Sequence, residues 1–157
     1  MGFPTDNVAM IAVIQRVSSA TVRSTGKKPV KIGKGMVVLV GIDRGDTSAE
    51  AKKLGLKLVK LRIMGDKSGK LNLNLNTVDG ELLLVSQFTL ISVVGSGNRP
   101  SFSHAASGDK AIVLFDDLVA VCRQYLQRVK TGFFSVYSEV ELINDGPVTL
   151  VLDSQKF

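Results

Sequence analysis

Residues 142–154 read LINDGPVTLVLDS, a stretch in which apolar and β-branched residues flank Asp145-Gly146-Pro147. This pattern predicts a strand that is interrupted in its middle. Proline cannot donate a ladder hydrogen bond, so Pro147 indicates a bulge, an edge strand or a turn. An X-Pro bond also tolerates the cis isomer, which forces a sharp and rigid reversal. Taken alone, the Gly-Pro pair leaves two interpretations open, a structural connector and a functional turn.

Short runs with strand character occupy the first quarter of the chain and reappear later. Residues 11–17, 20–24, 30–32, 36–42 and 81–86 are rich in β-branched and aliphatic side chains. The segment Gly33-Lys34-Gly35 is interpreted as a hairpin loop between two of these runs, and Thr25 to Pro29 as a turn. The first quarter is therefore predicted to be a β-meander.

Two segments have helical periodicity. Thr47 and Glu50 form a possible capping box before an amphipathic helix, whose outer face carries lysines between Lys52 and Lys60. Residues 110–130 are predicted to form a second, longer helix with one apolar stripe. The order of elements indicates a single α+β domain with a mostly antiparallel sheet and two main helices.

Length and composition fit one domain of 157 residues, which we place at residues 10–157, after a short flexible extension at residues 1–9. The formal net charge is +6. A basic chain favours an anionic partner, with nucleic acid first, although a solvated lysine-rich helix face would give the same count. The lysines from Lys52 to Lys60 are open to both interpretations, contact with nucleic-acid phosphates and simple solvation.

The cellular setting is predicted to be cytoplasmic. Cys122 is the only cysteine, so an internal disulfide is excluded, and its place in an apolar stripe favours a core role. The longest apolar runs are far shorter than a membrane span, so no membrane partner is expected.

The sequence offers few of the usual catalytic groups. One histidine, His104, and one cysteine cannot assemble a common zinc site, and no phosphate-binding or dinucleotide-binding glycine motif is present. We therefore expect no metal and no cofactor. A Ser-His-Asp triad built on His104 lacks any supporting pattern.

A second polar segment, Ser86-Gln87-Phe88-Thr89, follows the most apolar predicted strand. A turn at a strand end can direct backbone N–H groups and hydroxyls at a substrate carbonyl, as in an oxyanion hole. The alternative is that these side chains only satisfy one another at the end of the strand.

Four motifs together resemble the D-aminoacyl-tRNA deacylase family in order and spacing, over nearly the whole chain from Met10 to Ser154. They are Gln15-Arg16-Val17, Ser86-Gln87-Phe88-Thr89-Leu90, Arg99-Pro100-Ser101-Phe102 and Asn144-Asp145-Gly146-Pro147-Val148-Thr149. The resemblance implies a barrel-like sheet, a homodimer with active sites at the subunit interface, and hydrolysis of the ester that joins a D-amino acid or glycine to tRNA.

The resemblance also implies roles for individual residues. Gly146-Pro147 would be a cis dipeptide that enters the pocket of the partner subunit, with Arg16 holding its orientation. Its carbonyls would accept hydrogen bonds from the substrate's α-ammonium and exclude an L side chain. Backbone N–H groups near Gln87 and Phe88, together with the 2′-hydroxyl of the terminal adenosine, would stabilise the reaction.

Three alternatives remain at this stage. Thr89 is a possible nucleophile, but no neighbouring base in the sequence is evident, so positioning of the substrate is favoured over covalent catalysis. A non-catalytic module that binds tRNA or other nucleic acid could have the same fold and charge. A generic serine or threonine esterase that uses His104 is the third alternative.

Overall fold

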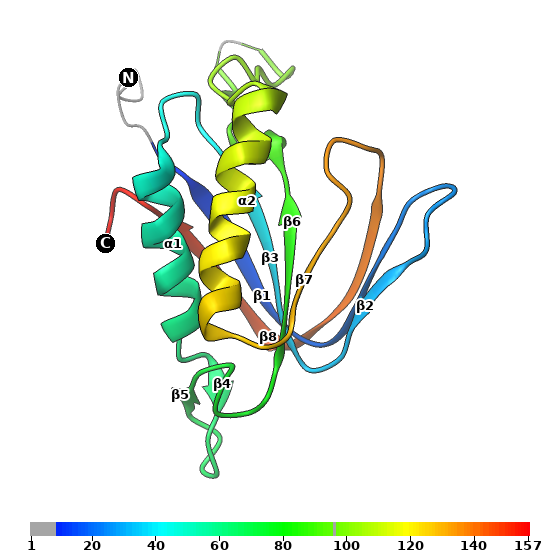
Figure 1. Cartoon of the computed structure of the whole chain (residues 1–157), viewed down its shortest axis with the longest axis vertical. Coiled ribbons are helices and arrows are strands. Elements are labelled where there is room, and N and C mark those ends of the chain that lie inside the picture. The colour runs from blue at the N-terminus through cyan, green and yellow to red at the C-terminus, as the bar shows by residue number, and fades with distance from the viewer. Residues whose placement is uncertain (1–8, 96) are drawn as a thin grey trace.

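The computed structural model describes residues 9–95 and 97–157, and β1 (Ile11–Arg23) is the strand around which the sheet is organised (Figure 1). Along one side, β1 pairs antiparallel with β2 (Val30–Ile32) and β3 (Gly35–Gly41). Along the other side it pairs antiparallel with β8 (Glu139–Asp153). The predicted runs at residues 11–17 and 20–24 therefore belong to one long strand.

The hairpin predicted at Gly33-Lys34-Gly35 is wrong. Val17 opposes Gly35 and Ala20 opposes Ile32, so one antiparallel register with β1 continues through both short strands. The break between them is filled by Glu81, whose carboxylate accepts from the Gly33 N–H at 3.1 Å and whose own N–H donates to Lys34. The chain reverses instead between β1 and β2, at the turn that the sequence indicated.

The remaining strands curve the sheet until it is nearly closed. β6 (Glu81–Ser86) pairs parallel with β3, and β7 (Val129–Thr131) pairs parallel with β6. The Lys130 ammonium then donates to the Lys31 main-chain oxygen at 2.6 Å, which joins β7 to β2. The fold is a single α+β domain with a barrel-like mixed sheet, and the predicted fold class is confirmed.

Two helices cover one face of the sheet side by side (Figure 1). α1 (Ser48–Lys60) begins with the predicted capping box of Thr47 and Glu50, and the hydrogen bond from the Thr47 hydroxyl lowers the pKa of the Glu50 carboxyl. α2 (Gly108–Tyr125) was predicted to continue to residue 130, which is wrong. Residues 129–131 enter the sheet instead, because Val129 pairs with Leu82 in a parallel ladder.

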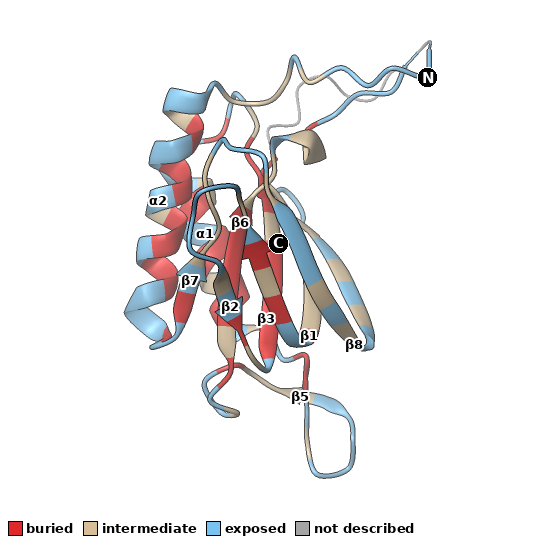
Figure 2. Cartoon of the chain, turned by 90° about the vertical axis from the view of Figure 1, so that its right-hand side faces the viewer, coloured by how far each residue is buried: buried red, intermediate tan, exposed pale blue. Residues whose placement is uncertain are grey.

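The core has two parts, one on each face of the sheet. The larger lies between the sheet and the helices, and the smaller lies on the opposite, inward-curled face (Figure 2). Cys122 is fully buried in the larger part, and burial raises the pKa of its thiol to about 12. Its predicted core role is therefore confirmed. The smaller part consists of Val17, Ala20, Val22, Ile32, Val37, Leu83 and Val85.

The smaller elements complete the chain. β4 (Met64–Gly65) and β5 (Leu71–Leu73) form a separate two-stranded hairpin, and a single 3₁₀ turn, η1 (Phe88–Leu90), follows β6. Residues 1–8 of the predicted extension lie outside the described residues, whereas Ala9 is buried. None of the helices in the described ranges is long and apolar enough to cross a membrane.

Candidate active site

The first candidate segment lies where β6 ends. Ser86 opposes Val40 of β3, and the Gln87 N–H donates to the Val40 oxygen at 2.8 Å. The Gln87 amide is therefore occupied by the ladder. The next two amides, those of Phe88 and Thr89, have no backbone acceptor within the described part of the chain, as is usual at the start of a helical turn. This turn thus presents two adjacent N–H donors at the edge of the sheet.

The side chains of Gln87 and Thr89 are paired with each other. The Gln87 Nε2 donates to the Thr89 Oγ1, which leaves the threonine hydroxyl with an amide neighbour. No imidazole or carboxylate among the described residues is hydrogen-bonded to Thr89 or Ser86. An amide is not a base, so the contacts of Thr89 suit a positioning group better than a nucleophile.

Phe88 connects two of the sequence motifs. Its ring packs edge-on against Phe102, with centroids 5.2 Å apart and planes at 78°, a favourable aromatic geometry. The Phe88 side chain is nevertheless 57% exposed, which leaves an open apolar surface beside the free amides. Phe102 was part of a motif but was not assigned a role; its position after Arg99-Pro100 was the only available signal.

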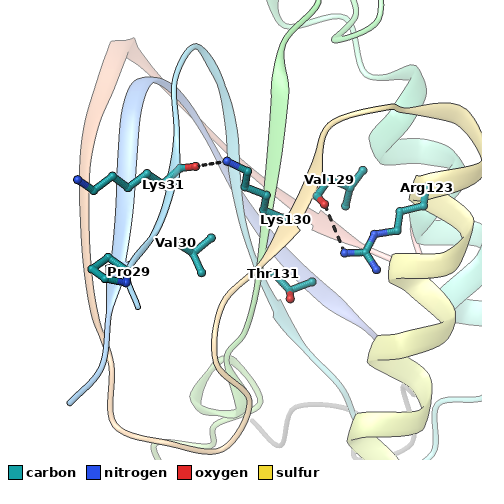
Figure 3. A pocket seen from close by; sticks show the side chains of 7 residues that line it. All are labelled: Pro29, Val30, Lys31, Arg123, Val129, Lys130 and Thr131. Carbon is teal, nitrogen blue, oxygen red and sulfur yellow. Dashed lines mark hydrogen bonds between the residues drawn. The ribbon is translucent and has the colours of Figure 1, made fainter. Parts of the chain in front are cut away.

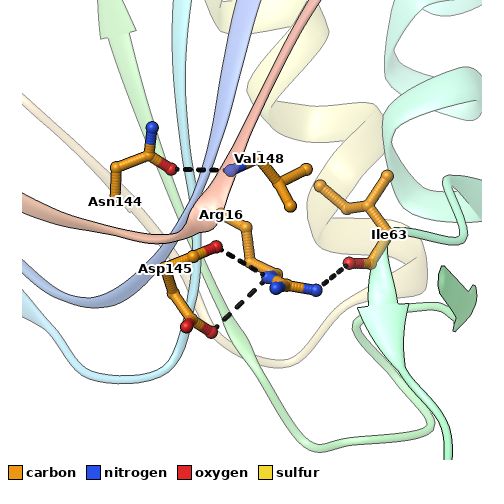
Figure 4. Close-up of polar contacts among 5 residues, drawn as sticks. All are labelled: Arg16, Ile63, Asn144, Asp145 and Val148. Atoms are coloured by element: carbon orange, nitrogen blue, oxygen red, sulfur yellow. Dashed lines mark hydrogen bonds and ion pairs between the residues drawn. The ribbon is translucent and has the colours of Figure 1, made fainter. Parts of the chain in front are cut away.

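The second candidate segment is held by Arg16 (Figure 4). The Arg16 Nε donates to the Asp145 main-chain oxygen at 3.1 Å and lies 3.4 Å from the Asp145 carboxylate. The Arg16 Nη1 donates to the Ile63 oxygen at 2.9 Å. One guanidinium therefore links β1, the start of the turn in β8 and the segment after α1, a use of several donors that lysine could not reproduce.

The predicted interruption of the strand is wrong, because β8 continues from Glu139 to Asp153, and Gly146-Pro147 lies in a bulge marked by the register shift against β1 between Gln15 and Val17. The Gly146-Pro147 bond is cis, and Gly146 has a φ of +133°, in the region that favours glycine. A Cβ at Gly146 would lie 2.9 Å from the Val148 side chain and 3.2 Å from the Arg16 guanidinium. The Asn144 Oδ1 accepts from the Val148 N–H at 3.2 Å across the turn (Figure 4). Asn144 is thus a second residue that fixes the turn, and sequence reasoning missed its role.

Within one chain the two segments lie far apart. The Gly146-Pro147 bulge lies opposite Arg16, and Arg16 is in register with Met36 and Leu82, four residues before Ser86. The two segments are also three strands apart in the sheet. Strand geometry gives about 13 Å along the strands and about 14 Å across them. The structure therefore brings Arg16 to the Gly-Pro turn and Phe88 to Phe102, but it does not bring these two groups together.

Two other predicted features have different outcomes. The His104 main-chain oxygen accepts a hydrogen bond from the Arg44 N–H at 2.8 Å. Among the described residues, His104 makes no hydrogen bond to Ser86 or Thr89. On α1, the Lys53 and Lys57 ammonium groups each lie 5.2 Å from the centroid of the Phe157 ring, and Lys53 also donates to the Ser154 oxygen. Lys53 and Lys57, two of the four lysines on this face, therefore contact the last residues of the chain.

Comparison with known proteins gives consistent matches across the chain. The model of the family described as D-Tyr-tRNA(Tyr) deacylase matches residues 13–153. A protein of Thermosipho africanus named D-aminoacyl-tRNA deacylase is 47% identical over 147 residues, covering 94% of this chain and 99% of the relative. A protein of the same name from Clostridium acetobutylicum is 46% identical with the same coverage.

Solved structures share the fold. One named "c-Myc DNA Unwinding Element Binding Protein" has a TM-score of 0.84 and 36% identity, and covers 90% of this chain and 97% of its own. A second, described as a probable eukaryotic D-amino acid tRNA deacylase, has a TM-score of 0.81 at 17% identity, and covers 92% of this chain and 99% of its own. The second likeness shows the fold alone.

Proposed function

Because the chain belongs to the D-Tyr-tRNA(Tyr) deacylase family, and is thus a hydrolase of the D-aminoacyl-tRNA ester bond, we propose that it proofreads chirality through its Gly146-Pro147 turn. It releases free D-amino acid and tRNA, and it also hydrolyses glycyl-tRNA, in which the tRNA is mischarged with glycine. It rejects L-aminoacyl-tRNA. The observation that carries the proposal is the anchoring of the turn by Arg16 and Asn144, since discrimination of this kind requires a rigid backbone.

Selection against the L form follows from geometry. If the ammonium, the ester carbonyl and the ribose are all held, exchanging hydrogen and side chain on the α-carbon drives an L side chain into the turn. The carbonyls of the turn accept hydrogen bonds from the α-ammonium. The turn therefore excludes the L side chain sterically and makes no contact that depends on the chemistry of the side chain. Many D-amino acids are therefore accepted, and glycine passes because it has no side chain to collide.

We propose that the turn acts in the active site of a partner subunit, in a homodimer. The separation of the two segments within one chain supports this arrangement, because Gly146-Pro147 lies far from the free amides of Phe88 and Thr89. The outer edge of β8 also supports it. Among the described strands β8 pairs only with β1, and its Ile143 and Val151 side chains are 61% and 67% exposed. An open strand edge with exposed apolar residues suits pairing with a second copy.

The proposed chemistry needs few groups. An aminoacyl ester is activated by its own ammonium and by the neighbouring ribose hydroxyl, so oxyanion donors and a positioned water suffice. The amides of Phe88 and Thr89 serve as the donors, Ser86 and Gln87 shape the turn that presents them, and Phe88 gives the adjacent apolar surface. Thr89 orients this turn through its contact with the Gln87 amide. No step passes through a covalent enzyme intermediate.

The test is hydrolysis of one tRNA charged in parallel with a D-amino acid, its L enantiomer and glycine. We expect rapid release of the D-amino acid and of glycine, and release of the L-amino acid at the uncatalysed rate. Equal rates for D and L, or no catalysis of either, would contradict chiral proofreading. Loss of glycine release alone would remove glycyl-tRNA from the substrates and leave the rest of the proposal intact.

The cross-subunit arrangement has its own test, by complementation. One variant carries Gly146→Ala. A second carries Gly41→Ala, whose added Cβ would crowd Leu90 and the Gln87 oxygen and displace the amide segment. We expect each to be weak by itself. In a mixed dimer, one active site combines the intact turn of the second variant with the intact amide segment of the first. We expect the mixed dimer to recover about half of the wild-type rate, and an equal mixture, in which about half of the dimers are mixed, about a quarter. A site built within one chain recovers nothing.

A non-catalytic nucleic-acid-binding module is the second candidate, because the chain carries a net charge of +6 and one structural neighbour is named for DNA binding. This candidate requires tight tRNA binding without hydrolysis of any charged form. The esterase alternative requires loss of activity in His104→Ala, for which we expect unchanged rates. These two measurements separate all three functions.

A further inference from the structure

A cavity lies between β2, β7 and the end of α2, apart from both candidate segments (Figure 3). Its volume is about 360 Å³, and its lining includes three cationic residues, Lys31, Arg123 and Lys130, and no carboxylate residue. Pro29, Val30, Val129 and Thr131 form the rest of the lining. A hollow with several cations and no lining anion concentrates positive potential and attracts an anion.

The cations of the cavity differ in how firmly they are held. The Lys130 ammonium lies 3.5 Å from the Glu81 carboxylate and also bonds the Lys31 oxygen, so it closes the sheet. Among the described residues the Arg123 guanidinium donates only to the Val129 oxygen, at 3.4 Å, and it points from α2 toward β7 (Figure 3). Neither Arg123 nor Lys31 has a carboxylate partner among the described residues. Two cations at this site therefore remain without a neutralising partner.

The positive charge extends beyond the cavity along the turn that leads into β2. Lys27 and Lys28 lie in that turn and are exposed, and Lys27 also lies 5.6 Å from the centroid of the Phe133 ring. Lys34 is exposed at the break between β2 and β3. Several cations in succession suit a chain of phosphates better than one small anion, because phosphates repeat along a nucleic-acid backbone.

We propose that this cavity and its surroundings, with Arg123 and Lys31 as donors, bind phosphates of the tRNA backbone away from the aminoacyl end. The guanidinium presents a planar fork of N–H donors to one phosphate, and the Lys31 ammonium, which extends away from Arg123 and the cavity (Figure 3), meets a neighbouring one. The inference rests on the proposed function only in naming tRNA as the ligand. Since the site lies away from the ester, it contributes to tRNA affinity and to KM, and not to the chemical step.

The experiment measures the binding of uncharged tRNA to the full chain by fluorescence anisotropy over a range of salt concentrations. The test variant is Arg123→Gln with Lys31→Gln, two exposed side chains whose removal spares Lys130. The matched control is Lys67→Gln with Lys70→Gln, which removes two exposed charges from the β4–β5 hairpin. We expect the test variant to bind roughly ten-fold more weakly and to lose about 1.5 from the slope of log K against log salt.

Several outcomes would overturn the inference. Wild-type affinity in the test variant would do so, as would an equal loss in the control pair, which would mean that only net charge matters. A competition at matched ionic strength separates the two sources of phosphate. If inorganic phosphate binds to the wild type and not to the test variant, but displaces tRNA no better than chloride does, the cavity binds free phosphate instead; displacement of tRNA by phosphate that is lost in the test variant supports the inference.

Hydrolysis of a minimal substrate, a D-aminoacyl ester of adenosine, keeps this inference separate from the proposed function. The test variant should hydrolyse this substrate at the wild-type rate, because adenosine alone does not reach the cavity. A wild-type protein that binds tRNA through the cavity but hydrolyses neither substrate would refute the proposed function and leave the inference standing. A loss of minimal-substrate hydrolysis in the test variant would contradict the assigned role.

Discussion

Arg16 and Asp145 are joined twice, by a hydrogen bond of 3.1 Å from the Arg16 Nε to the Asp145 main-chain oxygen and by an ion pair of 3.4 Å to its carboxylate. The Asp145 side chain is 54% exposed, so the ion pair itself adds little stability. The main-chain contact matters more, because it fixes the residue that directly precedes Gly146-Pro147. Arg16 is therefore a positioning residue for the turn.

Replacing Arg16 with lysine keeps the charge but removes the second donor direction. We expect Arg16→Lys to lose the hydrogen bond to either the Asp145 or the Ile63 oxygen. The variant should have a kcat/KM for D-aminoacyl-tRNA about ten-fold lower and should hydrolyse the L substrate faster than the wild type does. The measurement is parallel hydrolysis of the two enantiomers.

The control for Arg16 is on the same strand. Arg23 of β1 also pairs with a carboxylate of β8, that of Glu141 at 3.5 Å, but away from the turn. Arg23→Lys should leave both rates unchanged. An equal loss in the two variants would indicate a general weakening of the contact between β1 and β8, and not a role for Arg16 at the turn.

Gly146→Ala introduces a methyl group where no space exists. The new Cβ would meet Val148 and the Arg16 guanidinium, and a φ of +133° is unfavourable for alanine. We expect a loss of about 1–3 kcal/mol in the free energy of unfolding, slower hydrolysis of the D substrate and impaired selectivity, with the fold retained. Gly108→Ala is the control, because nothing lies within 4 Å of its added Cβ. Unchanged selectivity in Gly146→Ala would remove the turn from the mechanism.

Much of this fold could be predicted from local sequence patterns. The capping box of Thr47 and Glu50, the buried strand before Ser86 and the bulge at Pro147 each depend on neighbouring residues, and each is present as expected. Two errors, at Gly33-Lys34-Gly35 and at the end of α2, have a common cause. In both places a partner strand distant in sequence determines the conformation, β1 in the first case and β6 in the second.

The candidate site shows the same limit. Sequence motifs identified the Gly-Pro turn and the segment from Ser86 to Thr89, but local patterns could not reveal that the Gln87 amide is occupied by Val40. Nor could they place Phe102 against Phe88, since the two rings come from segments joined only by the fold. The cavity at Arg123 was missed for the same reason, because β2, α2 and β7 meet only in three dimensions.

Thr89→Val tests whether the threonine hydroxyl is a nucleophile. Valine keeps the shape and removes the oxygen that accepts from the Gln87 amide. We expect kcat to fall by no more than about ten-fold, because the hydroxyl only orients the turn, whereas loss of a nucleophile typically costs about 10⁴-fold or more. Thr89→Ser, which keeps the hydroxyl, should stay near the wild-type rate. Single-turnover hydrolysis measures both, and accumulation of an acyl-enzyme in the wild type would oppose this prediction.

Gly41→Ala tests the same turn, at residues 87–90, from the neighbouring strand β3. A Cβ at Gly41 would lie 2.8 Å from the Leu90 Cβ and 3.2 Å from the Gln87 oxygen, so the segment after β6 must move. We expect a loss of about ten-fold or more in kcat with a smaller change in KM, because misplaced amide donors affect the transition state most. Gly65→Ala has open space around its added Cβ, so its kcat and KM should equal those of the wild type. Equal kinetics for all three proteins would argue against amide donors in this turn.

We expect Asp46 to make the stability of the chain depend on pH. Its side chain is fully buried before α1, its Oδ2 accepts from the Asp43 N–H at 2.7 Å, and its Oδ1 has no partner among the described residues. Burial raises the pKa of Asp46 to about 7, with the charges of Asp43 and Glu50 adding to the effect; the hydrogen bond from Asp43 and the charge of Lys110 oppose it. The folded protein thus holds this proton more tightly than the unfolded chain does.

The sign of the effect follows from that difference. The stabilising contribution is complete below about pH 4 and is lost as the pH rises to about 7, at up to about 1.4 kcal/mol for each unit by which the pKa is raised. Asp46→Asn keeps an acceptor for the Asp43 N–H but cannot ionise. We therefore expect the variant to gain stability relative to wild type as the pH rises from 4 to 7, measured by urea unfolding at each pH. A difference that stays constant across this window would show that the Asp46 pKa is not raised in the folded state.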